Sequence, residues 1–411
     1  KAEQKISATA GGFGVALDEL DNFGMSLTGV GDLDRDGVVD LVVGASHDDD
    51  GGPDRGAVYV LLLNADGTVK AEQKISATAG GLGATLKDSD HFGYSVAGLG
   101  DLDGDGTINL AVGAYYDDDG GTNRGAVYVL DLSLPSCVVD SDGDGLWDCQ
   151  EDANIDADND PATNLGPDTD GDTLPNYLDD DDDDDGVLTS AENADPNGDG
   201  DPRDALDSDR DGQPDYLDRP TIRSVVPIAD EQKISATTGG LIPPLLDGDQ
   251  FGKGLDSIGD IDGDGVVDLG VGVPERSGGG VFVLFMNADG TVRSYQEISA
   301  GVGGLGAAIE PNENFGRDVA GLGDLDGDGV PDIAVGSSRS NDGGTWRGAA
   351  YVLFLNADGT VKAEQKISST AGGLSASLVD FGSFGGSVGG IGDLDGDGVV
   401  DLAVGNFNDD D

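Results

Sequence analysis

The sequence predicts an all-β protein whose main part is a β-propeller of four-stranded antiparallel blades. Two observations support this prediction: one unit of sequence recurs five times, and each copy contains four short runs of apolar and β-branched residues. The copies begin at Phe-Gly pairs, whose Phe residues are 23, 92, 251, 315 and 384. No segment of helical length keeps an apolar period of 3.6 residues, so we expect little helix.

Each copy is expected to form one blade. In the first copy the strands are expected at Met25–Val30, Val39–Val43, Ala57–Leu63 and Glu72–Ser76. A single sheet cannot bury both of its faces, whereas sheets stacked around an axis can. We therefore favour a closed or nearly closed propeller over an open solenoid, with the Phe of each Phe-Gly pair between adjacent sheets. The turn Asn-Ala-Asp-Gly, a hairpin signal, links the third run to the fourth at 64–67, 287–290 and 356–359.

The number of expected strands is uneven at the two ends of the chain. The last blade is incomplete, because copy five reaches Asp411 before its third strand, and Glu3–Ser7 reads as an outer strand without a partner in its own blade. Two interpretations stay open. The chain is a fragment of a longer repeat protein, which we favour, or a neighbouring molecule completes the open blade in a head-to-tail assembly by strand addition.

An acidic loop follows the first expected strand in every copy, with alternating acids around a glycine. This arrangement directs several carboxylates at one centre. Ca²⁺ binds six to eight oxygens in a flexible shell, whereas Mg²⁺ needs a stricter octahedron, so calcium is the expected ion. The candidate ligands, with a backbone carbonyl at the seventh position of each loop, are Asp32, Asp34, Asp36, Val38 and Asp40; Asp101, Asp103, Asp105, Thr107 and Asn109; Asp260, Asp262, Asp264, Val266 and Asp268; Asp324, Asp326, Asp328, Val330 and Asp332; and Asp393, Asp395, Asp397, Val399 and Asp401.

These loops differ from EF-hands. Val43 stands where an EF-hand carries its bidentate Glu, and the flanking segments are strands instead of helices. The expected role of the ion is structural, bracing the loop between two strands. Asn109 lowers the ligand charge of the second loop, so we expect this loop to bind most weakly. Extracellular modules of this kind bind calcium at roughly 10⁻⁴–10⁻³ M.

The net charge agrees with bound cations. The chain has 82 acidic and 21 basic residues, a formal charge of −61, and a compact state with this charge repels itself unless cations neutralise it. The same balance excludes a simple nucleic-acid binder and argues against docking on an anionic membrane. No stretch reaches the ~20 apolar residues that span a bilayer. No signal peptide precedes Lys1, so in a secreted protein it has been removed or lies outside these residues.

The repeated unit resembles the FG-GAP repeat, the blade unit of integrin α-subunit-type propellers. The resemblance rests on the Phe-Gly pair, the acidic loop and the Val-Gly ending in that order, as in FGMSLTGVGDLDRDGVVDLVVGA at 23–45. It covers all five copies. Integrin-type propellers have seven blades, whereas five copies are present here, and only Gly44-Ala45 and Gly113-Ala114 keep the final Gly-Ala pair. The resemblance implies a propeller and a role in adhesion.

Residues 135–220 have a different composition and divide the propeller into parts at 1–134 and 221–411. This insertion has 29 acidic and three basic residues, with too few apolar residues for a conventional core. It replaces the third-to-fourth turn of blade two, because Glu231–Ser235 resumes the repeat. Motifs such as DTDGDTLPNYLD at 168–179 resemble thrombospondin type-3 repeats, which implies calcium ligands at Asp140, Asp142, Asp144 and Asp148; Asp168, Asp170 and Asp172; and Asp207, Asp209, Asp211 and Asp215. Seven aspartates at 179–185 supply further ligands or form a solvated charge run.

Two cysteines, Cys137 and Cys149, bracket the first of these acidic motifs. A zinc site needs about four soft ligands, so we expect the two cysteines to form a disulfide. A disulfide implies an oxidising compartment, which favours an extracellular or cell-surface location.

No residue pattern points to catalysis, so we expect that the protein is not an enzyme. The only histidines, His47 and His91, lie beside expected loops, and a histidine-dependent triad or a zinc hydrolase therefore has little support. The regular spacing of the carboxylates is explained by metal binding, which leaves no distinct pair for a glycosidase.

The loops between second and third strands are the expected binding surface, on the face away from the acidic loops. Aromatic and Arg residues on loops are common interface anchors. The expected function is adhesion or surface scaffolding, with a protein or glycan ligand, or copies of the chain itself, as partner. We expect neither nucleic acid as a partner nor direct membrane insertion. The alternatives are a self-assembling subunit of an extracellular filament or sheath, and an accessory module of a secreted enzyme. The candidate anchors are His47, Arg55, Tyr115, Tyr116, Arg124, Trp346 and Arg347.

Overall fold

The structure is a computed structural model that describes residues 4–15, 17–18, 20–33, 37–104, 107–132, 228–241 and 245–408. Every regular element within these ranges is a β-strand, which confirms the prediction of an all-β fold. Accordingly, the described part of the chain contains no helix of the length and apolarity that a membrane crossing requires.

Five antiparallel sheets follow one another along the chain, and each keeps its strands in sequence order. Blade one contains β1 (Leu27–Gly31), β2 (Asp40–Ala45), β3 (Ala57–Leu63) and β4 (Val69–Ser76). Blade two contains β5 (Phe92–Gly100), β6 (Ile108–Ala114), β7 (Ala126–Leu132) and β8 (Ile228–Ile234). Blade three contains β9 (Leu255–Gly259), β10 (Asp268–Gly272), β11 (Gly280–Met286) and β12 (Val292–Ser299). Blade four contains β13 (Phe315–Gly323), β14 (Asp332–Ser337), β15 (Ala349–Leu355) and β16 (Val361–Ser368), and blade five contains β17 (Phe384–Gly390) and β18 (Leu402–Asn406).

The observed strand bounds are close to the expected ones. The bounds of β3 agree with the prediction. β1 begins after Met25, because the Met25 N–H closes a turn on the Asn22 carbonyl at 3.0 Å. β4 begins at Val69, directly after the Asn-Ala-Asp-Gly turn, in which the Gly67 N–H donates to the Asn64 carbonyl at 2.8 Å. The hairpin predicted at this turn is therefore confirmed.

Blade two is completed by strands that lie on either side of the insertion. β7 and β8 pair in antiparallel fashion, with Val127 opposite Ile234 and Leu130 opposite Glu231, although residues 133–227 separate the two strands in sequence. The insertion thus connects a third strand to a fourth strand, as expected.

The hydrophobic core lies between neighbouring sheets. The Phe of the Phe-Gly pair is fully buried in blades two, three and four. Phe92 belongs to a cluster that joins Val58 of β3 to Leu110 of β6. Its ring meets Tyr128 of β7 edge-on, with 5.3 Å between the ring centroids. The predicted position of these Phe side chains between blades is confirmed, and burying one such side chain typically contributes about 1.5–3 kcal/mol.

Glycines allow the backbone of one blade to approach the backbone of the next. Gly56, which precedes β3, forms an isolated parallel bridge with Phe92 of β5. A Cβ atom on Gly56 would lie 2.1 Å from the Phe92 carbonyl oxygen, and the φ angle of Gly56 is +86°, a value that strains other residues. The same bridge recurs at Gly125, Gly279 and Gly348. Blade spacing is thus set by backbone contact.

Two carboxylates connect the innermost strands of blades three, four and five. Asp256 of β9 accepts a hydrogen bond from the Gly321 N–H of β13 at 2.9 Å. Asp318 of β13 accepts one from the Val388 N–H of β17 at 2.8 Å. Burial between the blades raises the pKa of Asp256 to about 6 and that of Asp318 to about 7.

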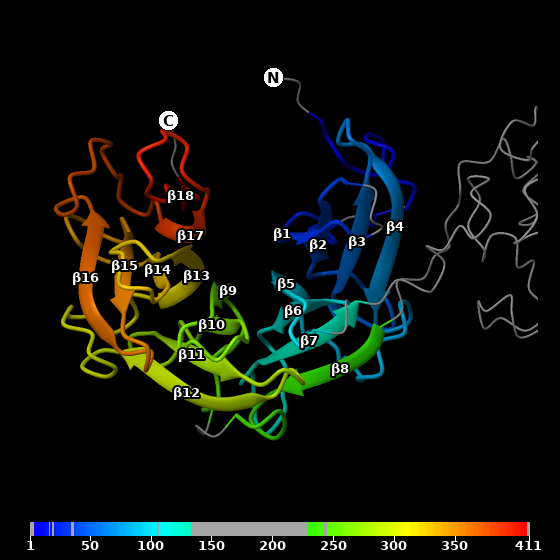
Figure 1. Cartoon of the computed structure of the whole chain (residues 1–411), viewed down its shortest axis with the longest axis horizontal. Helices are drawn as coiled ribbons and strands as arrows, with labels where there is room; N and C mark the ends of the chain where they lie inside the picture. The colour runs from blue at the N-terminus through cyan, green and yellow to red at the C-terminus, as the bar shows by residue number, and fades with distance from the viewer. Residues whose placement is uncertain are drawn as a thin grey trace, which may run out of the picture.

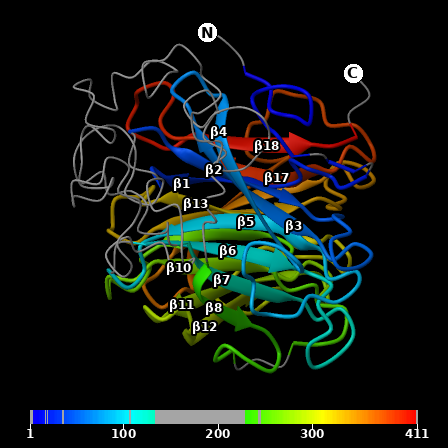
Figure 2. The same cartoon turned by 90° about the vertical axis from the view of Figure 1, so that its right-hand side faces the viewer.

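The five blades stand in an arc around a common axis, with the first strands innermost and the fourth strands outermost (Figure 1). Figure 2 shows the strands running across this arc between two rims of loops. Blades one and five stand on either side of a gap in Figure 1. The β-propeller prediction is confirmed, and over the described ranges the ring stays open.

Apolar side chains that are buried in the middle blades are exposed at the two ends of the arc. Leu27 of blade one is 65% exposed, whereas Leu255, its equivalent in blade three, is 5% exposed. Leu394 of blade five is 72% exposed, whereas its equivalent Ile261 is 2% exposed. The end blades therefore present faces that neighbouring blades cover elsewhere.

The expected outer strand at Glu3–Ser7 is wrong over its described part. Gln4–Ile6 belong to no strand, and Ser7 forms only an isolated bridge with Ala10. The segment instead packs on blade one, where the Gly11 carbonyl accepts a hydrogen bond from the Val69 N–H at 2.7 Å.

Candidate metal centres

The acidic loops of blades three, four and five bring carboxylates together in the same way. In blade three, one oxygen from each of Asp260, Asp262 and Asp268 lies within 4.8 Å of the other two. The equivalent trios are Asp324, Asp326 and Asp332 in blade four and Asp393, Asp395 and Asp401 in blade five. Clusters of carboxylate oxygens on a tight turn fit a hard cation such as Ca²⁺.

The first acid of each loop organises the turn. Asp260 accepts hydrogen bonds from the N–H groups of Gly263 at 2.7 Å, Asp264 at 3.1 Å and Gly265 at 2.8 Å. Asp324 and Asp393 make the same three contacts in blades four and five. The glycines at positions four and six, with φ between about +77° and +93°, allow the chain to wrap around this carboxylate.

The last acid of each loop is buried at the start of the second strand. Asp268 is fully buried, and its two oxygens accept hydrogen bonds from the Ile261 N–H at 2.9 Å and the Met286 N–H at 3.0 Å. Burial, together with the nearby charges of Asp262 and Asp264, raises the pKa of Asp268 to about 7. A cation beside this carboxylate would favour its ionised form.

The third acidic position of each loop lies outside these trios, and its predicted role as a ligand stays a prediction. Asp264 lies outside the trio of blade three, and its carboxylate accepts a hydrogen bond from the Val266 N–H at 2.9 Å. Asp328 and Asp397 make the equivalent bond in blades four and five. The side chains of Val266 and Val330 pack against blade cores, and the carbonyl ligands predicted at Val38, Thr107, Val266, Val330 and Val399 stay predictions.

The loops of blades one and two are described in part, because Asp34, Asp36 and Asp105 lie outside the described residues. Asp40 holds the same buried position as Asp268, and its carboxylate accepts hydrogen bonds from the Leu33 N–H at 2.8 Å and the Leu63 N–H at 2.9 Å. Asn109 takes the same place in blade two and accepts a hydrogen bond from the Leu102 N–H at 2.8 Å. Asn109 therefore keeps this hydrogen bond while it removes one negative charge from the loop. Asp32 accepts from the Gly37 N–H and Asp101 from the Gly104 N–H, as first acids do elsewhere.

Basic side chains from the fourth strands reach two of these loops, and sequence reasoning missed them. Arg293 of β12 forms ion pairs with Asp262 and Asp264. Lys362 of β16 forms ion pairs with Asp326, at 2.9 Å, and with Asp328. Both residues follow the Val that opens a fourth strand, so the recurring Asn-Ala-Asp-Gly-Thr-Val-Lys/Arg motif is the signal that could have revealed them.

Comparison with known proteins identifies the repeated unit. A family model described as FG-GAP repeat matches residues 23–61 and 315–353, and a second model with the same description matches residues 84–130. Each match begins at or near a Phe-Gly pair and runs through the acidic loop into the third strand. Blades one, two and four therefore match FG-GAP repeats.

The chain is also similar to integrin alpha subunits. It is 42% identical over 102 residues to integrin alpha pat-2 of Caenorhabditis briggsae, over 25% of this chain and 8% of that protein. It is 32% identical over 179 residues to human integrin alpha-7, over 41% of this chain and 14% of that protein. Human integrin alpha-IIb is 34% identical over 132 residues, covering 31% of this chain and 11% of its own length. The similar region is thus a small part of each relative.

Removing the cation that competes for an FG-GAP loop is expected to raise its calcium affinity. In the Lys362→Gln variant we expect blade four to bind Ca²⁺ about fivefold more tightly, because one positive charge near a surface-exposed loop opposes the ion by ~1 kcal/mol. Calcium titration followed by calorimetry checks this. Lys87→Gln is the control, because Lys87 pairs with Asp119 at 3.4 Å on the opposite rim. Unchanged or weaker binding in Lys362→Gln would contradict the competition.

The second-to-third loops of the FG-GAP blades are held by ion pairs between and within blades. Arg55 and Arg347, proposed from sequence as interface anchors, pair with Asp88 at 2.9 Å and Asp380 at 2.7 Å in the following blade unit. Arg124 makes the same contact, with Asp247 at 2.8 Å. The acids of these loops also pair with fourth-strand lysines: Lys74 with Asp48 and Asp50, Lys233 with Asp117 and Asp119, and Lys366 with Asp342. The arginines therefore brace neighbouring blades.

Trp346, another anchor predicted on these loops, remains accessible. It is 44% exposed, and its ring meets that of Phe381, which was not predicted and is 54% exposed, edge-on at 5.7 Å between centroids. The Arg339 guanidinium lies 5.5 Å from the Trp346 ring centroid. We call these three residues the Trp346 cluster. Tyr115, by contrast, is buried in a stack with His91 and Tyr116.

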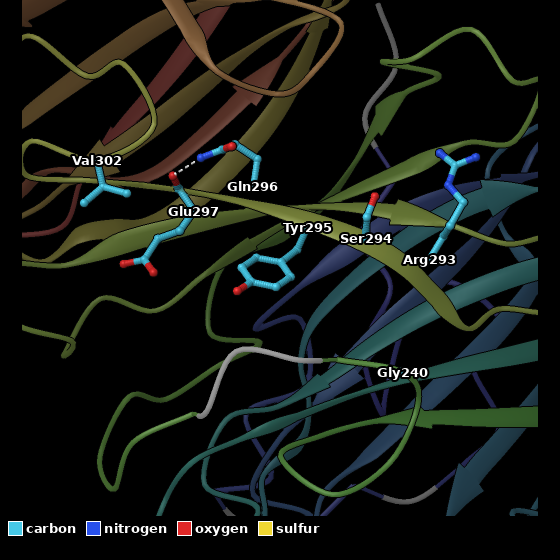
Figure 3. Close-up of a pocket in the computed structure, with 7 residues that line it drawn as sticks. All are labelled: Gly240, Arg293, Ser294, Tyr295, Gln296, Glu297 and Val302. Carbon is cyan, nitrogen blue, oxygen red and sulfur yellow. Dashed lines mark hydrogen bonds between the residues drawn. The ribbon is translucent and has the colours of Figure 1, made fainter.

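A shallow hollow of about 550 Å³ lies along the outermost strand of blade three (Figure 3). It is lined by Gly240, Val302 and the side chains of 293–297 on β12. Figure 3 shows Arg293 and Glu297 at opposite ends of this row, so their charges do not converge on one point. The Gln296 amide donates to the Glu297 carbonyl at 2.6 Å. The hollow therefore offers no assembled polar site.

The remaining sequence predictions for metal sites concern the insertion. The candidate ligands there and the pair Cys137 and Cys149 lie outside the described residues. Their calcium-binding and disulfide roles stay predictions.

Proposed function

We propose that this chain is an extracellular, calcium-binding FG-GAP propeller region that acts in adhesion or as a surface structural scaffold without catalysing a reaction. The observation that carries the proposal is the recurrence of one acidic-loop geometry in blades three, four and five. The similarity to integrin alpha subunits supports the adhesive role. Calcium, when bound, neutralises the loop carboxylates and stiffens the connection between first and second strands.

The insertion extends the same proposal. With their thrombospondin type-3-like motifs, residues 135–220, which lie between β7 and β8 in the sequence, add further calcium sites to the chain. The proposed Cys137–Cys149 disulfide places the chain in an oxidising compartment. Both features suit a secreted or surface protein that meets millimolar calcium.

The Trp346 cluster is the proposed contact surface for a protein or glycan ligand. Exposed Trp and Arg residues dominate binding energy in many interfaces, and this cluster lies on second-to-third and fourth-to-first loops, at the opposite ends of the strands from the acidic loops. A ligand can therefore bind there while the acidic loops hold their ions.

A binding screen tests the adhesive function. The whole chain, coupled to beads, is applied to immobilised extracellular matrix proteins and glycans in millimolar calcium and again in chelator. We expect calcium-dependent retention on at least one surface, weakened at least about tenfold by Trp346→Ala. Tyr295→Ala, on the outer edge of β12, is the matched control and should leave retention unchanged. Absence of retention on every surface would count against adhesion.

The exposed ends of the arc favour a second candidate function, self-assembly into a filament or sheath. Leu27 and Leu394 are exposed on the end blades, whereas their equivalents Leu255 and Ile261 in blade three are buried. Within the described residues, β17 and β18 form a two-stranded sheet. A second copy would cover these faces and extend this sheet. Sedimentation velocity at several concentrations, with and without calcium, tests the idea. A discrete monomer at all concentrations excludes it, whereas growth with concentration supports it.

The third candidate, an accessory module of a secreted enzyme, depends on the full-length protein. A catalytic domain encoded next to these residues would favour this role.

A further inference from the structure

We propose that His47, Asp54 and His91 form a binding site for a borderline divalent transition ion such as Zn²⁺, separate from the acidic FG-GAP loops. One ligand atom from each of these residues lies within 4.8 Å of the other two. The site belongs to the rim that carries the second-to-third loops.

Two neighbouring blades supply the three side chains. His47 and Asp54 lie on the loop between β2 and β3, and His91 directly precedes β5. The two imidazole rings meet with 4.6 Å between their centroids. The His91 N–H donates to the Asp54 carbonyl at 3.1 Å, so the backbones of both loops are fixed against each other. The chain has only two histidines, and the fold brings both to this point.

The combination of ligand residues at this site is not repeated in the other blades. The residue before each Phe-Gly pair is left-handed in all five blades, and it is Asn22, His91, Gln250, Asn314 and Ser383 in chain order. In the second-to-third loops, Tyr116 and Arg339 occupy the position of His47 in blades two and four. Among the described blades, only the junction between blades one and two therefore combines two imidazoles with a carboxylate.

The hydrogen bonds around His91 prepare a ring nitrogen for a metal. The Nδ1 atom of His91 lies 3.0 Å from the Ser46 carbonyl oxygen. A carbonyl only accepts hydrogen bonds, so Nδ1 carries the proton and Nε2 keeps its lone pair. This outer contact is the one that metal-binding histidines make in most sites. At His47 the Asn22 amide nitrogen lies 2.9 Å from Nδ1 and donates to it, and the Ser46 hydroxyl lies 3.1 Å from the same atom. Zinc binding through Nε2 of His47 therefore requires the proton to move to Nδ1, with the Ser46 hydroxyl oxygen as its acceptor in place of the Asn22 amide.

The chemistry of the three ligands selects the ion. Two imidazoles and one carboxylate suit Zn²⁺, Cu²⁺ or Ni²⁺ better than Ca²⁺, which prefers oxygen ligands. Zinc–ligand bonds of about 2.0–2.2 Å in a tetrahedron separate ligand atoms by about 3.4 Å, so each pair of ligand atoms approaches by at most about 1.4 Å on binding. His47 and Asp54 are half-exposed, which gives the ion access and these side chains room to move. The charges of Asp54 and Lys253 act in opposite directions on His91. The Lys253 ammonium lies 4.7 Å from the ring centroid of Tyr115, which stacks on His91.

Histidine-selective NMR of the whole chain tests the site, because only two imidazoles contribute signals. The chain is held in millimolar calcium to fill the acidic loops and is titrated with zinc chloride. We expect the NMR signals of both imidazoles to shift together and to stop shifting once one zinc ion is bound per site. Calorimetry gives the affinity of the same binding event. Unshifted imidazoles at excess zinc would overturn the proposal.

His91→Asn is the decisive variant, because Asn occupies the same left-handed position in blades one and four. We expect this variant to keep its melting temperature in calcium and to lose at least about tenfold in zinc affinity at His47. Asp395→Asn, in the acidic loop of blade five, is the matched control and should leave the imidazole shifts unchanged. Zinc binding by His91→Asn with wild-type affinity would also overturn the proposal.

Discussion

Chelation of divalent cations is expected to lower the melting temperature of the chain by at least about 10 °C. A ligand that binds only the folded state at a hundred times its dissociation constant stabilises that state by ~2.7 kcal/mol per site. Even two such sites add roughly 5 kcal/mol, and each kcal/mol moves the melting temperature by about 2–4 °C in domains of 150–250 residues. The effect should be large because the metal-free loops hold acids such as Asp268 in buried, mutually repelling positions.

Calorimetric melting in calcium and in excess chelator measures this effect. Restoring calcium after chelation should restore the original curve, and magnesium at the same concentration should restore only part of it, because Mg²⁺ fits such flexible oxygen shells poorly. If the melting curve in excess chelator coincided with the curve in calcium, the acidic loops would not be metal sites. We also expect the insertion to unfold before the propeller in chelator.

Substituting an inter-blade glycine is expected to destabilise the chain by at least about 3 kcal/mol. In Gly56→Ala the new Cβ atom would lie 2.1 Å from the Phe92 carbonyl oxygen, a backbone atom that cannot move aside without separating the blades. The backbone of Gly56 also has a φ of +86°, which costs another residue roughly 1–2 kcal/mol. Urea-induced unfolding in saturating calcium measures the loss of free energy.

Gly81→Ala is the matched control for Gly56→Ala. Gly81 has a φ of +76°, and a Cβ atom there meets no atom within 4 Å. The control should therefore cost only the ~1 kcal/mol of backbone strain. Equal losses in the two variants would show that close contact between blades is not the source of the effect. The same comparison can be repeated at Gly348, where a Cβ atom would lie 1.9 Å from the Phe384 carbonyl oxygen.

The repeated sequence allowed much of the fold to be predicted, because five copies of one pattern can be compared with each other to locate the strands. The strand at Ala57–Leu63 and the buried Phe92 were predicted from this repetition. The first and last acids of the loops could be assigned as a cluster, because a short turn fixes their relative positions. The exact start of β1 depended on a turn hydrogen bond from Met25, which no composition signal reveals.

The contacts that sequence reasoning missed join residues far apart in the chain. Lys362 and Asp328, or Arg55 and Asp88, become neighbours only when a sheet is assembled or two blades stack. The pairing of His47 with His91 likewise depends on the spacing between blades one and two. These relationships are set by tertiary packing, and of the three only the contact of Lys362 leaves a signal in the sequence, the basic residue after the Val that opens a fourth strand.

The pairing of β7 with β8 across residues 133–227 has a consequence for engineering. The hairpin at this outermost edge tolerates a long guest sequence while its two strands keep their register. The turns at 64–67, 287–290 and 356–359 join the same two strands of their own blades and share one hydrogen bond, from the Gly N–H to the Asn carbonyl, so we expect them to accept foreign domains as well. Domains inserted at these turns would project from the outer edge of the arc, one from each blade and at regular angles, as in a display scaffold.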